Sequence, residues 1–250
     1  MGKQGAGRGI QTRPSPARSA RRDDGRASRQ AGGRDGCESR IGREIAYAFA
    51  AAGTRLALTY FRDRKDGEAA AARCRELAAA ATDLFFLDLS DDESVREFAG
   101  AVVECLGAID ILVNNAGVVR RKPFAEQTFD DIEWHLRVDL EGVLKLTLLC
   151  LPHVTEQIIM IGSTAALHGS RRLSTYGAAK WGLRGFTKAL ASEQPHLRIV
   201  AVHPTVTATR MNDFQGRPPE EVARVVLAIA RGDLAAENGA DVDMREHTAC

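Results

Sequence analysis

The sequence predicts an α/β protein whose parallel sheet is covered by helices on both faces. Short segments that are apolar at nearly every position alternate with longer segments in which apolar residues recur every three or four positions. The chain has 250 residues, of which 44% are hydrophobic, and this suits one domain with a substantial core.

The expected strands are apolar runs bounded by turn or helix signals. They cover 54–60, 84–89, 109–115, 157–163 and 197–204, with a last short strand at "ADVDM" (240–244). Because these runs do not alternate with polar residues, both of their faces must be buried.

The first expected helix is amphipathic, with Ile41, Ile45 and Phe49 spaced four apart and Gly53 at its C-cap position. The others follow the strands in turn. A helix is predicted at 66–81, and a second follows the capping box formed by Ser90 and Glu93. A long helix is predicted at 129–151, with Thr128 as its N-cap, and another begins at Ser174. The last is "PPEEVARVVLAIA", which has proline in its first turn.

Residues 1–34 differ from the rest of the chain. Met1 and Ile10 are the only large apolar residues among the first 35, which carry eight Arg and one Lys against three Asp. Such a segment cannot bury enough surface to offset its ordering entropy. We expect a disordered tail, or an out-of-frame start, before a folded domain at 35–250.

Composition argues against several classes of protein. The five cysteines are dispersed without metal-type pairs, which favours a reducing, cytoplasmic setting and no metal site. No stretch reaches 18 apolar residues, so we expect no membrane span. Nucleic-acid binding through the basic arm is the least favoured alternative, because the arm lacks interleaved aromatic residues.

The strongest chemical signal is "GSTAALHGSRRLSTYGAAK", which contains Ser163, Tyr176 and Lys180. Tyr176 and Lys180 are four residues apart and therefore share one face of a helix. An ammonium beside a phenol favours the phenolate and lowers its pKa toward the working range. Ser163, at the end of a strand, is positioned to stabilise charge on the same substrate oxygen.

With "NNAG" at 114–117, these residues resemble the classical short-chain dehydrogenase/reductase family over about residues 35–245. The resemblance implies a single domain with a Rossmann-type doubly wound sheet and an NAD(H) or NADP(H) cofactor. It also implies hydride transfer to or from a small carbonyl or alcohol compound, as in 3-oxoacyl reductases or related ketoreductases, and a homodimer or homotetramer. Lys180 would then hold the nicotinamide ribose as well as tune Tyr176.

The glycine loop "DGCESRIG" keeps Gly36 and Gly42 but has Arg40 in place of the family's middle glycine. It resembles the pteridine-reductase-like TGxxxRxG variant, in which the arginine faces the cofactor phosphates. The resemblance assigns cofactor contacts to Gly36, Arg40, Ile41, Gly42, Arg62, Asp88, Asn114, Ala116, Gly117, Tyr176, Lys180, Pro204 and Thr205.

Arg62 favours NADP(H) over NAD(H), because NAD-type sites carry an acidic residue after the second strand. Asp63 instead favours NAD(H). The alternative interpretation of Arg62 is that it belongs to a solvated basic loop. Asp88 resembles the acidic residue of the family that contacts the adenine amino group. Alternatively, Asp88 only forms an ordinary turn at the end of its strand.

Two further positions depart from the family pattern. Asp139 stands where the family has an asparagine that holds a water of the proton relay, so it is either part of the catalytic group or a helix-packing residue. Thr205 replaces a glycine after Pro204 and lacks glycine's freedom in φ. Both departures support an alternative function, a catalytically weak relative that binds nucleotide or a partner without turnover.

The first strand is atypical or missing. In the family's strand order 3-2-1-4-5-6-7 it lies between the second and fourth strands, yet "RQAGGR" before the glycine loop has no apolar run. Its loss would divide the sheet and leave unpaired edges, at about 1–3 kcal/mol for each buried group. Either residues 28–35 form a polar strand, or the N-terminal segment is not the sequence selected for this fold.

Overall fold

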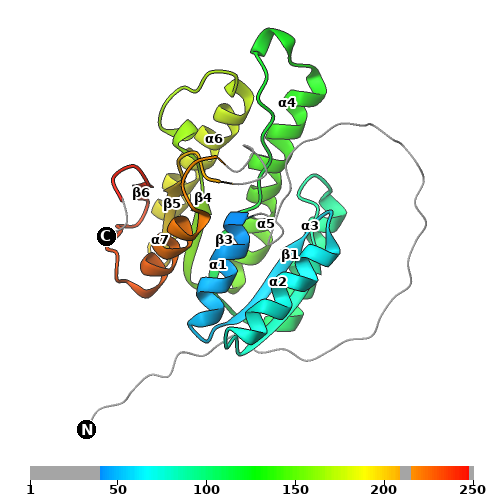
Figure 1. Cartoon of the computed structure of the whole chain (residues 1–250), viewed down its shortest axis with the longest axis vertical. Coiled ribbons are helices and arrows are strands. Elements are labelled where there is room, and N and C mark those ends of the chain that lie inside the picture. The colour runs from blue at the N-terminus through cyan, green and yellow to red at the C-terminus, as the bar shows by residue number, and fades with distance from the viewer. Residues whose placement is uncertain (1–39, 209–214, 248–250) are drawn as a thin grey trace, which may run out of the picture.

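The computed structural model describes residues 40–208 and 215–247, so the expected N-terminal tail lies outside the described residues. Helices and strands alternate along the chain, and the predicted α/β class is confirmed (Figure 1). The elements are α1 Arg40–Ala51, β1 Arg55–Tyr60, α2 Arg64–Glu76, β2 Ala81–Phe86, α3 Asp92–Leu106, β3 Ile109–Asn114, α4 Phe129–Leu136, α5 Gly142–Cys150, β4 Val154–Ile161, α6 Ser174–Glu193, β5 Arg198–His203, α7 Pro219–Arg231 and β6 Asp241–Asp243.

The described strands form two separate parallel sheets. One has the order β1-β2 and the other the order β3-β4-β5-β6. This is the doubly wound order expected from the sequence, divided at the position of the first strand. The two alternatives for residues 28–35 concern residues that the structure does not describe.

Helices cover both faces of the strands, as the apolar runs predict. The neighbouring helices α1, α2 and α7 lie on one face, and α3, α5 and α6 lie on the other (Figure 1). The central strands β4 and β5 supply the most deeply buried side chains, including Ile158, Ile159, Ile199 and Val200, none of which is exposed. Burial on both faces explains why these strands are continuously apolar.

Two local predictions are wrong. The N-cap of α3 is Asp91, whose carboxylate accepts from the Glu93 backbone N–H, so Ser90 and Glu93 form no capping box. The Ser90 hydroxyl instead donates to Asp88 over 2.6 Å. The predicted strand at 84–89 is found three residues earlier, at Ala81–Phe86.

The helix predicted at 66–81 begins and ends earlier. Asp63 caps α2, and the helix ends at Glu76 because Ala78 takes a positive φ of 83°. The predicted helix at 129–151 is continuous but changes type, since a π-helical turn, Arg137–Glu141, joins α4 to α5. Thr128 caps α4 as predicted.

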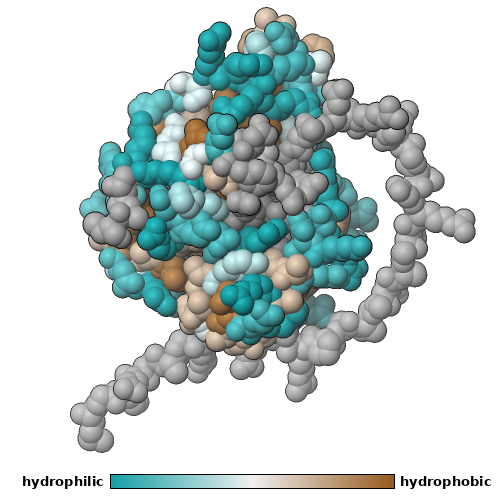
Figure 2. Space-filling model, in the orientation of Figure 1, coloured by the Kyte–Doolittle hydropathy of each residue, from teal (hydrophilic) through white to brown (hydrophobic). Residues whose placement is uncertain are grey.

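Three cysteines, Cys74, Cys105 and Cys150, are described, and all are free thiols. Burial raises their pKa values to about 11, so they are unreactive near neutral pH. Within 40–208 and 215–247, no helix is long and apolar enough to cross a membrane. Hydrophilic residues predominate on the face shown in Figure 2, and apolar residues form small patches there.

Candidate active site

The predicted catalytic residues meet at the carboxyl end of the larger sheet. Ser163 lies two residues beyond β4, and Tyr176 and Lys180 lie in the first two turns of α6. Asp139 enters from the π-helical turn between α4 and α5. Ligands of open α/β sheets bind at this edge, beyond the carboxyl ends of the strands.

Lys180 lies between the tyrosine and the aspartate. Its ammonium nitrogen is 5.8 Å from the centroid of the Tyr176 ring and 3.4 Å from Asp139 Oδ1. The same nitrogen donates to the Ile161 carbonyl over 3.4 Å. Only 3% of Lys180 is exposed, so solvent screens these interactions weakly.

Burial raises the pKa of Tyr176 above its usual value. The Lys180 charge and a hydrogen bond with Ser163 act in the opposite direction, while the Asp139 charge raises the pKa further. The predicted lowering by Lys180 is therefore present but is outweighed by burial. The phenol keeps its proton and can donate it.

Asp139 is fully buried at the turn where the helix changes type. Its Oδ1 accepts from the Val118 backbone N–H over 3.0 Å, while Oδ2 has no hydrogen-bond partner among the described residues. Burial raises the pKa of this carboxyl, against the lowering effect of Lys180. Asp139 is thus both a helix-packing residue and the ion-pair partner of Lys180.

Gly117 brings the backbone after β3 against this pair. A Cβ at Gly117 would lie 2.7 Å from Asp139 Oδ1 and 3.2 Å from Lys180 Nζ. Only glycine leaves room for both side chains in their present positions.

Ser163 is oriented from both sides. Its hydroxyl oxygen accepts from the Ala165 backbone N–H over 3.1 Å and caps a short 3₁₀ turn. Its carbonyl oxygen accepts from His203 Nδ1 over 3.1 Å. His203 is fully buried at the end of β5, so the strand itself fixes the backbone of Ser163.

His203 belongs to a polar network, running from the buried ring to the surface, that sequence reasoning missed. Its Nε2 donates to Asp241 over 2.9 Å, and Asp241 also binds Arg184 and Lys188 of α6. Although burial favours the neutral form of Asp241, these donors hold its pKa well below the usual range. Both ring nitrogens of His203 therefore face oxygen atoms of other residues. No sequence spacing signals this network, because its members come from three elements.

His135 supports Tyr176 from α4. The two rings meet edge to face, with centroids 6.2 Å apart. Its Nε2 accepts from the Arg120 backbone N–H, and its Nδ1 donates to the Asp131 carbonyl. Both ring nitrogens of His135 are therefore used for positioning.

The predicted cofactor contacts at the end of β3 are found at the same edge. However, the Asn114 side chain points inward and donates to Thr147 Oγ1 over 3.1 Å and to Met160 Sδ over 3.2 Å. Its amide joins β3 to α5 and β4, so contact with a cofactor is left to the backbone and to Ala116 and Gly117.

The predicted phosphate-side residues are only partly described. Gly36 lies outside the described residues, and so does the side chain of Arg40, which begins α1. Gly42 follows in the first turn of α1, and Ile41 packs against the core cluster formed by α1, α7 and the larger sheet. The N-terminus of a helix attracts anions, as a phosphate site requires.

The residues predicted near the adenosine differ in their environments. Arg62 is exposed after β1, with its guanidinium 5.1 Å from the Phe61 ring centroid. Asp63 accepts from the Asp66 backbone N–H as the cap of α2. Asp88 accepts from the backbone and the hydroxyl of Ser90, as an ordinary strand-end turn requires.

Pro204 and Thr205 follow β5 beside Ser163. The Pro204 carbonyl accepts from the Thr164 backbone N–H over 3.0 Å, which joins the ends of β4 and β5. Thr205 is not among the described residues with positive φ, so the turn needs no glycine there. Residues 209–214, which follow this turn, lie outside the described residues.

Comparisons with known proteins identify the family of the chain. The family model described as short chain dehydrogenase matches residues 35–219, and the chain belongs to this family. It is 30% identical over 179 residues to the 3-oxoacyl-[acyl-carrier-protein] reductase FabG of Thermotoga maritima, covering 63% of this chain and 73% of that protein. It is also 30% identical over 236 residues to D-threitol dehydrogenase of Mycolicibacterium smegmatis, covering 83% and 88%.

Solved structures give the same fold. A short-chain dehydrogenase from Burkholderia cenocepacia in complex with NADP matches with a TM-score of 0.77 and 28% identity, covering 83% of this chain and 92% of that one. A 3-oxoacyl-[acyl-carrier protein] reductase from Brucella melitensis in complex with NAD matches with a TM-score of 0.75 and 25% identity, with the same coverage. The chain is therefore an oxidoreductase of a nicotinamide-using family.

The described residues fit the nicotinamide half of such a cofactor. Because Gly117 has no side chain, the Lys180 ammonium lies against the backbone that follows β3, and this donor would suit a ribose hydroxyl. Tyr176 lies on the same helix face as Lys180, and its phenol would supply a proton donor for a carbonyl bound there.

Proposed function

We propose that the protein is an NADPH-dependent reductase of small carbonyl compounds, which also catalyses the reverse oxidation of alcohols. The observation that carries the proposal is the meeting of Ser163, Tyr176 and Lys180 at the carboxyl edge of the sheet. The names of its relatives, which include a 3-oxoacyl reductase and a polyol dehydrogenase, support a substrate with a C=O or CH–OH group.

Each catalytic side chain has one role in the reduction. The bound cofactor supplies the hydride to the carbonyl carbon. Tyr176 donates its phenolic proton to the carbonyl oxygen, and its raised pKa keeps that proton in place until the substrate is bound. Ser163 donates a hydrogen bond to the same oxygen, and Lys180 stabilises the phenolate that remains.

The preference for NADPH rests on charge at the adenosine end. Arg62 is exposed, and its guanidinium suits a 2′-phosphate. Asp63, the residue that would oppose this choice, already caps α2. Arg40, the first residue of α1, is the second basic residue that the family resemblance assigns to the phosphates.

A titration of the full chain with NADPH and, separately, NADH tests the proposal. The intrinsic fluorescence of Trp134 and Trp181 reports binding. We expect saturable NADPH binding that is about tenfold tighter than NADH binding, which corresponds to one lost phosphate contact of about 1.4 kcal/mol. Folded protein that binds neither cofactor would contradict it.

The second candidate function is a relative that binds nucleotide without efficient turnover. One observation favours it. The Asp139 carboxyl, whose Oδ1 lies 3.4 Å from Lys180 Nζ, has no hydrogen-bond partner for its Oδ2 among the described residues. Saturable NADPH binding without consumption by any ketone in a broad panel would distinguish this function from the first.

We propose a homodimer or homotetramer built on α5 and α6. Large apolar side chains are exposed on these helices, with 68% of Leu148 and 47% of Trp181 accessible. Exposed apolar side chains on both helices suit an association surface. The free thiols of Cys74, Cys105 and Cys150 support a cytoplasmic location. Sedimentation of the full chain tests the assembly.

A further inference from the structure

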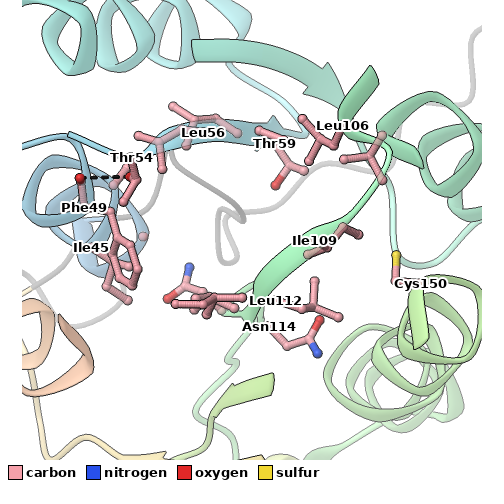
Figure 3. Close-up of a pocket in the computed structure, with 18 of the residues that line it drawn as sticks. Ile45, Phe49, Thr54, Leu56, Thr59, Leu106, Ile109, Leu112, Asn114 and Cys150 are labelled. Carbon is pink, nitrogen blue, oxygen red and sulfur yellow. Dashed lines mark hydrogen bonds between the residues drawn. The ribbon is translucent and has the colours of Figure 1, made fainter. Parts of the chain in front are cut away.

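Two loops meet at the carboxyl edge of the larger sheet, where the catalytic residues lie. Figure 3 shows Ile109 and Asn114 on β3, which ends at Asn114. The first loop, at 118–123, follows this strand. The second loop, at 168–173, follows β4 and leads directly into α6. Both loops therefore adjoin the place where a reacting carbonyl would bind.

The two loops are joined to each other. The Lys122 backbone N–H donates to the Arg172 carbonyl over 2.9 Å. Arg172 takes a φ of 66°, in the left-handed region that long side chains rarely adopt. The hydrogen bond from Lys122 helps to hold this conformation, and residues strained in this way cluster at functional sites.

The loops carry positive charge and no negative charge. The first loop reads "VVRRKP" and the second reads "HGSRRL", so together they hold four arginines and one lysine but no acidic residue. Oppositely charged ligands are attracted to a surface that carries one sign of charge. The charge of the two loops therefore favours an anion at this edge of the sheet.

Two of the five basic side chains share one buried carboxylate. Arg120 binds Asp131, and the Lys122 ammonium lies 2.9 Å from the same carboxylate, which is only 3% exposed. The Thr128 backbone N–H and these two cations hold the pKa of Asp131 well below its usual range. One carboxylate thus serves two cations, and the loops keep an excess of positive charge.

Arg121 lies between these two residues and is exposed. Its position is fixed from one side by the Arg120 backbone N–H, which donates to His135 Nε2 over 3.0 Å, and from the other side by the paired Lys122. Arg121 itself forms no ion pair with a described residue. Its charge lowers the pKa of Tyr176, so its guanidinium lies within electrostatic range of the phenol.

We propose that the substrate is a ketone that carries a carboxylate or a phosphate, which Arg121 binds while Ser163 and Tyr176 hold the carbonyl oxygen. The inference rests on the function proposed above and narrows its substrate class. A guanidinium binds the oxygens of either group through two parallel N–H donors. Arg171 and Arg172, which are exposed on the second loop, add attraction for the anion at longer range.

Matched pairs of probes test the role of the anion. Acetoacetate and levulinate are compared with their methyl esters, and dihydroxyacetone phosphate is compared with dihydroxyacetone. Each pair keeps the ketone and changes only the charged group. Calorimetry measures binding to the full chain with NADP⁺ present, so that the ketone binds but no hydride is available. Steady-state reduction with NADPH gives kcat/KM for the same pairs.

We expect at least one anionic probe to bind about tenfold more tightly than its neutral partner. Arg121→Gln should weaken binding of that probe about tenfold and leave binding of the neutral partner unchanged. Arg121→Lys keeps the charge and should retain part of the preference. Arg224→Gln, which removes a charge from an exposed site on α7, is the control and should change neither.

Equal binding within every pair, or no binding of any probe by a folded chain, would overturn the proposal. If neutral ketones are then reduced, the reductase function stands without it. Anion-selective binding that depends on Arg121, without reduction of any ketone, would support the anion site and contradict the reductase function. If Arg121→Gln lowers kcat/KM equally for the anionic and the neutral probe, the arginine acts on Tyr176 and the proposal is wrong.

Discussion

Replacement of Gly117 by alanine tests how tightly the site is assembled. The added Cβ would lie 2.7 Å from Asp139 Oδ1 and 3.2 Å from Lys180 Nζ, and these two atoms are themselves only 3.4 Å apart. Real Cβ atoms do not approach an oxygen so closely, so one of the two side chains must move. Displacement of a catalytic group by a fraction of an ångström to 1 Å costs about 10- to 100-fold in kcat/KM.

The expected change in stability is smaller than the change in activity. Overpacking costs about 1–3 kcal/mol, and loss of glycine's freedom in the unfolded chain returns about 0.5–1 kcal/mol. The net loss of about 1–2 kcal/mol lowers the melting temperature by about 2–8 °C in a domain of this size. Thermal melts and steady-state carbonyl reduction measure the two effects.

Gly185→Ala is the matched control, because Gly185 is exposed on the same helix as Lys180 and nothing lies within 4 Å of its added Cβ. It should raise stability by about 0.5–1 kcal/mol and leave kcat/KM within about twofold. Activity of Gly117→Ala within twofold of the parent, or an equal loss in both variants, would refute the packing described for Asp139 and Lys180.

Three further changes test individual groups. Asp139→Asn removes the negative charge that raises the pKa of Tyr176. Because ketone reduction needs the protonated phenol, its rate should decline at a lower pH than in the parent. An unchanged alkaline limb of the pH–rate profile would contradict this. Arg62→Ala should weaken NADPH binding about tenfold without affecting NADH binding. Arg64→Ala serves as the control, because Arg64 is exposed and pairs with Glu68 in the next turn. His203→Phe should lower kcat about tenfold with little change in KM, because the Ser163 carbonyl loses its donor, and His203→Gln should recover part of the loss.

Much of the fold follows from local patterns in the sequence. Continuous apolar runs predicted both the strands and their burial on two faces. The expectation of an atypical first strand falls on residues 28–35, which lie outside the described part of the chain. The capping box at Ser90 was wrong because one serine hydroxyl has two competing partners, and Asp88 takes it. Local sequence does not show which partner is nearer in three dimensions.

Sequence spacing predicted only part of the site, namely which residues lie close together. Tyr176 and Lys180 share a helix face, so their proximity follows from four residues of separation. The pKa of Tyr176 does not follow from that spacing, because it depends on burial and on Asp139, which lies 37 residues earlier in the chain. The link from Ser163 through His203 to Asp241 joins three separate elements and leaves no local signature.

The central claim is that Tyr176 donates the proton in an NADPH-dependent reduction. The most direct measurement follows NADPH consumption by the full chain, with a panel of ketones that includes a 3-oxoacyl thioester, for the parent and for Tyr176→Phe. We expect turnover by the parent and a loss of at least about 100-fold in the variant, with NADPH binding retained. Equal turnover by the two proteins, or NADPH binding without turnover of any ketone, would contradict the claim.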